Sequence, residues 1–340
     1  MPSSAPTLRI TFFGRYANGP TDIVRCILLG LMELGHTVQE IDVGKPPGRF
    51  LHNPHRRAGG NGPVFIRSSV VEPMVDSFRP DVIILCAGGF AFDKGVEAFA
   101  RKAPVVGITL SDPDVFPTVS RYAHKFTVHT TNSLTAFERY KALGHTNTYL
   151  MPFAVDSRFF VPRPVSPEFE ADVAVIGHGR PDRLKVVERL RKRFKIRVYG
   201  QRWPKWADGP VRGEDWFRAA YSTRFLINFP RTVAGYTNVK VGVFEATATG
   251  RLLFTEYFDE MRRYFEYDKE IVGYRDVNEL EEKIRYYLDH PGEAERIARA
   301  GQLRCATEHT WARRLSGLLD TVVGLGSARP SAVSQTKAQR

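Results

Sequence analysis

The stretch "LRITFFGRYANGPTDIVRCILLGLMELGHTVQEIDV", residues 8–43, contains the signals of a strand, a helix and a second strand. It opens with a mostly apolar, β-branched and aromatic run that ends at a glycine, as a buried strand does. Residues 22–35 then place apolar side chains at helical spacing and close on Gly35. Because two strands joined by a helical crossover run parallel, the stretch predicts an α/β fold built on a parallel sheet.

The rest of the first half continues this pattern. Apolar runs that stop at glycine or polar residues predict interior parallel strands at residues 80–89, 103–112 and 124–132. A helix follows, with Ser133 as its N-cap and Gly144 as its stop. Residues 45–63 are rich in Pro, Gly, Arg and His and have no periodicity, so we expect a long loop there.

Four prolines within residues 152–167 interrupt regular structure, and a new strand–helix series begins directly afterwards. We therefore expect two Rossmann-like, doubly wound α/β domains that face each other across a cleft. Ligands in such folds bind at the carboxyl ends of the strands. The predicted parts are a disordered tail (1–7), a first domain (8–151), a linker (152–168), a second domain (169–318) whose final helices pack back on the first, and a disordered tail (326–340).

The formal net charge of +12 indicates an anionic partner, which could be nucleic acid, an acidic membrane face or a phosphorylated substrate. Lys and Arg are scattered over both halves and no nucleic-acid-binding motif is present, which disfavours nucleic acid. The basic segment "GRFLHNPHRR" (48–57) could contact an acidic acceptor or a membrane, or carry only solvated charge.

The cysteines, Cys26, Cys86 and Cys305, are isolated and odd in number, which argues against a disulfide framework or a structural zinc site. A reducing cytoplasm fits this pattern. The first residues lack the pattern of a secretion signal, and no apolar run reaches the roughly 18 residues that span a bilayer. We expect a cytoplasmic protein without a transmembrane segment, and a peripheral membrane contact stays open.

The loop "VIGHGRPDR", after the first strand of the second domain, is a candidate phosphate site. Gly177 and Gly179 would let backbone amides approach a phosphate, and Arg180 and Arg183 would supply charge. The loop lacks the full G-x-G-x-x-G pattern, so an ordinary tight turn explains it equally well.

The stretch "GYTNVKVGVFEATATG" predicts a helix that opens after a glycine turn. Tyr236, Thr237 and Asn238 would occupy its first turn, where free backbone amides and the helix dipole favour an anion such as a diphosphate. Two cations flank this terminus: Arg231 and Lys240.

Glu245 lies further along the same predicted helix, on a face shared with Val241 and Ala248. A carboxylate on this apolar stripe could accept two hydrogen bonds from a ribose 2′,3′-diol. A solvent-facing glutamate would fit the spacing equally well.

The segment "SDPDV" (111–115) follows an apolar strand and contains an Asp-x-Asp pair. Such a pair can hold a divalent cation, but it is more typical of a turn or an N-cap. Asp112 could also act as a base facing the cleft. Four histidines are further candidates, each more typical of a structural or solvated role: His52, His55, His124 and His129.

Residues 243–250, "VFEATATG", with "TN" upstream and "LLFTE" downstream, resemble a sequence block of GT-B glycosyltransferases, specifically the CgeB-like proteins and their group 1 relatives. The segments "LMPFAVDSRFF" and "ADVAVIG" resemble that family's interdomain segment and the first strand of its donor domain. Residues 265–315 resemble its C-terminal region. The likeness is clearest from about residue 150 to 318 and weaker before it.

This resemblance implies that the second domain binds a nucleotide-sugar and that the first domain faces the acceptor. It places Glu245 on the ribose hydroxyls and Tyr236, Thr237 and Asn238 around the diphosphate. Group 1 enzymes often carry a further Glu eight positions before the first, and Thr237 stands there in this chain. The departure leaves the donor sugar and the stereochemical course open.

The resemblance implies a glycosyltransferase of the hexosyltransferase type that uses no metal or other cofactor. Fixed amides and four cations, Arg180, Arg183, Arg231 and Lys240, would stabilise the charge on the departing nucleoside diphosphate. Asp112 would be the base of an inverting reaction. The alternatives are a GT-B-like nucleotide-sugar epimerase and a non-catalytic protein that binds a nucleotide-sugar or another anion.

Overall fold

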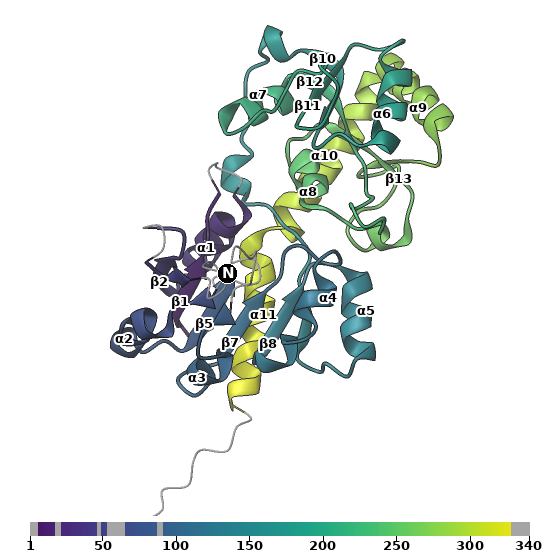
Figure 1. The fold of residues 1–340 in the computed structure, drawn as a ribbon. Helices are drawn as coiled ribbons and strands as arrows, with labels where there is room; N and C mark the ends of the chain where they lie inside the picture. Colours follow the sequence, from purple (N-terminus) through teal and green to yellow (C-terminus); the bar gives the residue numbers. More distant parts are fainter. Residues whose placement is uncertain (1–5, 18–21, 46–48, 53–64, 87–90, 328–340) are drawn as a thin grey trace, which may run out of the picture.

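The computed structural model describes residues 6–17, 22–45, 49–52, 65–86 and 91–327. They form two α/β domains, each built on a parallel sheet with helices on its faces (Figure 1). The predicted fold class is confirmed. The predicted tails, most of the 45–63 loop and the segment 48–57 lie largely outside the described residues.

The first domain contains a six-stranded sheet in the order β2-β1-β5-β7-β8-β9. Its strands are β1 (Arg9–Gly14), β2 (Thr37–Asp42), β5 (Val82–Cys86), β7 (Val105–Ile108), β8 (Val128–Thr131) and β9 (Thr148–Leu150). A small second sheet has the order β3-β4-β6, made of β3 (Leu51–His52), β4 (Phe65–Ile66) and β6 (Ala91–Phe92). The helices are α1 (Ile23–Glu33), α2 (Ser68–Phe78), α3 (Val96–Ala100), α4 (Phe116–Val119) and α5 (Leu134–Ala142), with a 3₁₀ turn η2 (Ala123–Lys125).

The second domain contains a five-stranded parallel sheet in the order β11-β10-β12-β13-β14. Its strands are β10 (Ala171–Ile176), β11 (Ile196–Tyr199), β12 (Thr223–Asn228), β13 (Leu252–Glu256) and β14 (Val272–Tyr274). The helices are α6 (Pro181–Leu190), α7 (Glu214–Tyr221), α8 (Val241–Ala248), α9 (Val277–Asp289), α10 (Pro291–Glu308) and α11 (Trp311–Ser327). The 3₁₀ turn η5 (Asp259–Arg263) follows β13, and η3 (Ser157–Phe159) and η4 (Pro167–Phe169) lie in the linker.

Capping residues and a glycine fix where helices of the first domain begin and end. Asp22 caps α1 by accepting a hydrogen bond from the Arg25 amide at 3.0 Å. Gly35, just after this helix, has a φ of +81°, which a glycine adopts without strain. Ser133 caps α5 by accepting from the Ala136 amide at 3.4 Å, as the sequence predicts.

The chain crosses between the domains twice, and the two crossings lie side by side. Helix α11 leaves the second domain and packs along α1 of the first, where it is the yellow helix of Figure 1. Val155 of the linker donates to the His309 carbonyl at 2.9 Å, and the Trp311 amide donates to the Val155 carbonyl at 3.1 Å. Because buried side chains of both domains form one continuous apolar cluster, the domains share part of their core.

Helix α8 begins at Val241, so the prediction that Tyr236, Thr237 and Asn238 form its first turn is wrong. Residues 230–238 form a hairpin instead, in which Arg231 pairs with Thr237. Gly235, with a φ of +87°, allows the tight turn. A glycine turn is compatible with a helix start and with a hairpin, and the pairing across the turn favours the hairpin.

Candidate functional site

The carbonyl oxygen of Arg231, just after β12, accepts hydrogen bonds from three cationic side chains. Arg180 Nη1 lies 3.0 Å and Arg183 Nη2 3.4 Å from it, and Lys240 Nζ is the third donor. Arg180 is the N-cap residue of α6 and Lys240 that of α8, so both lie at the carboxyl edge of the second sheet. We call Arg180, Arg183 and Lys240 the cation cluster. The structure brings these three predicted residues together around the carbonyl of the fourth, Arg231, whose own side chain is exposed.

The cation cluster is only partly neutralised. Arg180 forms an ion pair with Asp182 at 3.1 Å. Arg183 and Lys240 donate to backbone carbonyls, and no carboxylate lies within ion-pair distance of either among the described residues. Burial, followed by the charges of Arg183 and Arg180, lowers the pKa of Lys240 to about 7. An anion that replaced these neutral carbonyls would form stronger, charge-assisted hydrogen bonds.

The 230–238 hairpin connects the cation cluster to the first domain. Within the described residues, three side-chain hydrogen bonds join this hairpin to the first domain. Asn238 Nδ2 donates to the Asp112 carbonyl at 3.0 Å, Arg139 Nη1 to the Tyr236 hydroxyl at 3.3 Å, and the Thr232 hydroxyl to Asp114 Oδ1 at 2.9 Å. Tyr236 and Asn238 therefore contact the first domain and provide no helix-terminal amides for a diphosphate. Thr237 is exposed.

Asp112 is buried, with 3% of its surface exposed. The Thr131 hydroxyl donates to its Oδ2 at 2.7 Å, and the Asn132 side chain bonds its backbone amide and carbonyl. Burial raises the pKa of this carboxyl to about 6. Since this carboxylate is buried and bonded to Thr131, the prediction that Asp112 faces an open cleft is wrong, and a role as a base stays a prediction.

Gly177 and Gly179 both donate their backbone amides within the second domain, and Gly179 also lies in closely packed surroundings. The Gly177 amide donates to the Tyr199 carbonyl, and the Gly179 amide to the Gln201 carbonyl, both at 2.8 Å. A Cβ on Gly179 would lie 2.3 Å from the Arg202 carbonyl oxygen. The structure therefore supports the tight-turn alternative, because these two amides are already occupied and do not point at a phosphate.

Glu245 lies one turn into α8 and lines a small cavity between the domains, together with Ile23 and Cys26 of α1 and Val155 of the linker. Its side chain is only partly exposed. Burial raises the pKa of Glu245 to about 7. A purely solvent-facing role does not fit this position, and the contact with ribose stays a prediction.

The histidine candidates do not converge on one site. His129 is buried, with Nε2 3.0 Å from the Thr109 hydroxyl, and burial lowers its pKa to about 4. His124 packs near His145, with ring centroids 6.0 Å apart. His55 and the side chain of His52 lie outside the described residues.

The two carboxylates of the Asp-x-Asp pair do not face a common site either. Asp112 bonds Thr131 in its own domain, and Asp114 bonds Thr232 across the interface. Within the described segments, no group of three His, Cys, Asp or Glu side chains is arranged to hold a metal ion.

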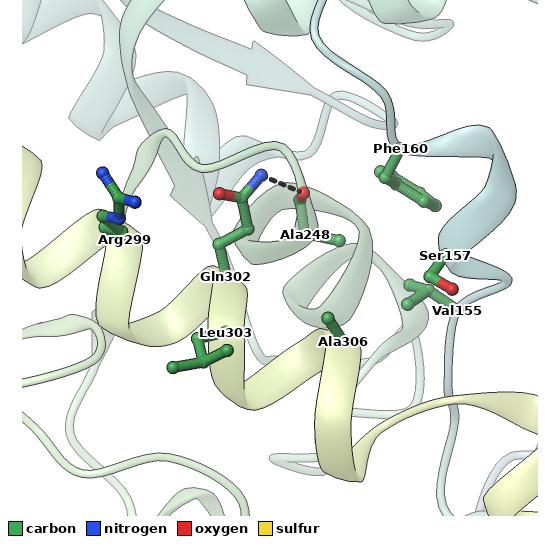
Figure 2. A pocket seen from close by; sticks show the side chains of 8 residues that line it. All are labelled: Val155, Ser157, Phe160, Ala248, Arg299, Gln302, Leu303 and Ala306. Atoms are coloured by element: carbon green, nitrogen blue, oxygen red, sulfur yellow. Dashed lines mark hydrogen bonds between the residues drawn. The ribbon is translucent and has the colours of Figure 1, made fainter.

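A pocket of about 380 Å³ opens at the other end of α8, between the linker and α10. Figure 2 shows Phe160 of the linker facing the last turn of α8, where Gln302 Nε2 donates to the Ala248 carbonyl at 3.2 Å. Its lining is mostly apolar, with Arg299 at the edge. The carboxyl end of a helix dipole does not attract an anion, so this pocket is chemically unlike the cation cluster.

Comparison with known proteins identifies the architecture. Residues 180–320 match the family model described as "Glycosyl transferase-like". The chain is similar to sucrose-phosphate synthase from Thermosynechococcus elongatus, with a TM-score of 0.61, 13% identity and coverage of 94% of this chain and 100% of that one. The chain has the GT-B fold. The match contains the cation cluster, so the site lies in the glycosyl transferase-like part of this GT-B chain.

Other relatives agree with this assignment. AviGT4, a glycosyltransferase of avilamycin A biosynthesis, has a TM-score of 0.61 at 14% identity and covers 94% of this chain and 99% of its own. Anabaena HepE, solved in complex with UDP-glucose, has a TM-score of 0.58 at 11% identity over 93% of this chain and 100% of its own. The spore protein CgeB of Bacillus subtilis is 20% identical over 246 residues, 66% of this chain and 78% of CgeB. The resemblance to CgeB-like and group 1 glycosyltransferases is confirmed.

Two residues beside the site were not predicted from the sequence. Asp114 belongs to the quoted "SDPDV" segment but had no role of its own, and Arg139 lies on α5 without any local motif. Both contact the 230–238 hairpin from the first domain. Only the spacing of Asp114, two residues after a strand-end aspartate, offered a signal.

A search of the described helices finds none with the length and apolar character needed to cross a bilayer.

Proposed function

We propose that this protein transfers a sugar from a nucleoside-diphosphate sugar to an acceptor hydroxyl. The observation that carries the proposal is the convergence of Arg180, Arg183 and Lys240 on one backbone carbonyl at the carboxyl edge of the second sheet. Two of these cations have neutral partners that a diphosphate could replace. The complex of the GT-B neighbour HepE with UDP-glucose supports a nucleotide-sugar as the donor.

The role of the cation cluster follows from the charge that develops on the leaving group. Breaking the bond between the sugar and the phosphate leaves negative charge on the nucleoside diphosphate, and preorganised cations stabilise that charge without rearranging. Their side chains are already held beside the Arg231 carbonyl, so little ordering remains to be done on binding. We propose that the cation cluster performs this role without a metal, in a transferase of the hexosyltransferase type.

Glu245 is the proposed partner of the nucleotide ribose. A carboxylate has enough lone pairs to accept from both hydroxyls of a diol. Its position between α1 and α8, with residues of both domains around it, suits a ligand held where the domains meet. The proposal covers an acceptor in solution and an acceptor at a membrane surface.

The direct test is a thermal-shift panel of UDP, GDP, TDP and their sugars on the wild type and on two variants, Glu245→Ala and Lys240→Met. We expect one nucleotide series to raise the melting temperature of the wild type and to lose most of that effect in both variants. If no nucleotide shifts the wild type, the proposal fails. An unchanged response in Glu245→Ala would remove the ribose assignment alone.

Turnover of the donor then separates three candidate functions. A glycosyltransferase releases nucleoside diphosphate faster when its acceptor is added, whereas an epimerase converts the donor sugar without any acceptor. A non-catalytic protein would bind the nucleotide-sugar and leave it unchanged. Nuclear magnetic resonance of the donor over time distinguishes these outcomes.

A further inference from the structure

The 230–238 hairpin occupies the N–H groups that a diphosphate would need. All three side chains of the cation cluster donate to the carbonyl of Arg231, and Arg180 donates to the carbonyl of Thr232 as well. Phosphate oxygens bound by the same side chains would compete with these carbonyls for the same donors. The hairpin and an anionic ligand are therefore alternative partners of the cation cluster.

The first domain holds the hairpin in this position. The Thr232 hydroxyl donates to Asp114 Oδ1 at 2.9 Å, and Arg139 Nη1 donates to the Tyr236 hydroxyl at 3.3 Å. Thr232 is buried and is bonded on both sides, because its hydroxyl contacts the first domain and its carbonyl contacts Arg180. A movement that takes this carbonyl away from the cations therefore also pulls the hydroxyl away from Asp114.

The held arrangement leaves polar atoms without partners among the described residues. Asn238 Nδ2 donates to the Asp112 carbonyl at 3.0 Å, but Asn238 Oδ1 is buried and accepts no hydrogen bond. Arg183 Nε is also buried without an acceptor. Because a buried polar atom without a partner costs free energy, a charged ligand has only a modest stability to overcome when it displaces the hairpin.

We propose that the 230–238 hairpin is an internal inhibitor of donor binding that the first domain holds in place. The inference rests on the proposed function, since it takes a nucleoside diphosphate as the ligand of the cation cluster. The cations stay on α6 and α8, and the diphosphate replaces the carbonyls beside them. The measured Kd then equals the intrinsic Kd divided by the fraction of molecules whose hairpin is released. Weakening the bonds to the first domain raises that fraction and tightens binding.

A competing explanation is that these bonds affect the protein only by joining the two domains. A second contact between the domains separates the two explanations. Glu260 Oε1 of η5 accepts from the Leu134 amide of α5 at 3.3 Å, and neither residue belongs to the hairpin. Glu260→Ala therefore removes a bond between the domains and leaves the hairpin held.

The experiment measures the Kd of UDP, or of the nucleoside diphosphate selected by the thermal-shift panel, by isothermal titration calorimetry. The proteins are full-length wild type, Thr232→Val, Tyr236→Phe, the double variant and Glu260→Ala, each checked for folding by its melting temperature without nucleotide. We expect the Kd to fall by about threefold in each single hairpin variant and by about tenfold in the double variant, the net effect of one and two hydrogen bonds. Glu260→Ala should bind like the wild type.

Tighter binding in a variant that has lost contacts is the result that a merely structural role would not produce. If the double variant binds as the wild type does or more weakly, or if Glu260→Ala binds as tightly as the double variant, the inhibitor assignment is overturned and donor binding stands. If no protein of the series binds any nucleoside diphosphate, the proposed function and this inference fail together.

Discussion

The polar side chains at the carboxyl edges of the two sheets differ in burial and in their hydrogen-bond partners: those of the first domain are buried, and the cations of the second are half-buried. At the edge of the first domain, Asp112, Thr131 and Asn132 are partnered with one another. At the edge of the second domain, Arg183 and Lys240 are held by backbone carbonyls. The first set is bonded internally except at Asp112 Oδ1, which is buried without a hydrogen-bond partner. In the second set, no carboxylate of the described residues lies within ion-pair distance of Arg183 or Lys240.

This difference separates structural polar residues from ligand-binding ones. A buried network whose members satisfy each other stabilises the fold, and removing one member leaves the others unpaired. A buried cation on a neutral carbonyl keeps a desolvation cost that an anion would offset. We therefore expect changes at the first edge to alter the free energy of unfolding and changes at the second edge to alter nucleotide affinity.

The largest expected effect is on stability at the first edge. Asp112→Ala should lower the free energy of unfolding by about 3 kcal/mol, because Thr131 loses its acceptor and a cavity remains. Urea denaturation measures this. Ser111→Ala, at an exposed position in the same loop, should stay within about 0.5 kcal/mol. Equal losses in both variants would contradict the comparison.

The next effect is on binding at the second edge. Lys240→Met should weaken nucleotide binding by about 2 kcal/mol, the value of a hydrogen bond to a charged group, which is roughly 30-fold in Kd. Isothermal titration calorimetry provides the readout. Lys185→Met, on the exposed face of α6, is the matched control and should bind like the wild type. A normal Kd in Lys240→Met would remove this amine from the site.

A smaller effect is expected from pH. Burial raises the pKa of Glu245 to about 7 and lowers that of Lys240 to about 7. Ionised Glu245 and protonated Lys240 are the forms that bind, so affinity should fall below pH 7 as Glu245 gains a proton and above pH 7 as Lys240 loses one. On the acid side and on the alkaline side of this profile, the nucleotide affinity should fall by at most about tenfold per pH unit.

Two variants show which residue causes the loss of affinity on each side of pH 7. Glu245→Gln should flatten the acid limb, and Lys240→Arg should flatten the alkaline limb. Calorimetric titrations at a series of pH values check both. A profile that neither variant alters would show that other groups control binding.

The smallest effect belongs to the helix cap at the first edge. Ser133→Ala should destabilise the protein by about 1 kcal/mol, because the Ala136 amide loses its side-chain acceptor. Thermal denaturation is the measurement, and Thr135→Ala, an exposed position on the same helix, is the control. Nucleotide affinity should not change, and a change would show that this cap also supports the binding edge.

Much of the fold was predictable because its signals are local. The interior parallel strands β5 and β7 lie within the apolar runs of residues 80–89 and 103–112, and Ser133 is the cap of α5. The candidate site was predictable in part: Arg180, Arg183 and Lys240 lie together as expected of residues near strand ends, whereas their role in binding stays a prediction. The start of α8 was not, because Gly235 suits either a helix start or a hairpin turn.

The sequence by itself determined the two α/β domains and the parallel order of their sheets. Apolar periodicity and glycine positions specify these features over short distances along the chain. Only the tertiary structure decided which carboxylate of "SDPDV" is buried and which is exposed. That outcome depends on Thr131 and Thr232, which are distant in sequence and reach the loop only after both domains have folded and packed together.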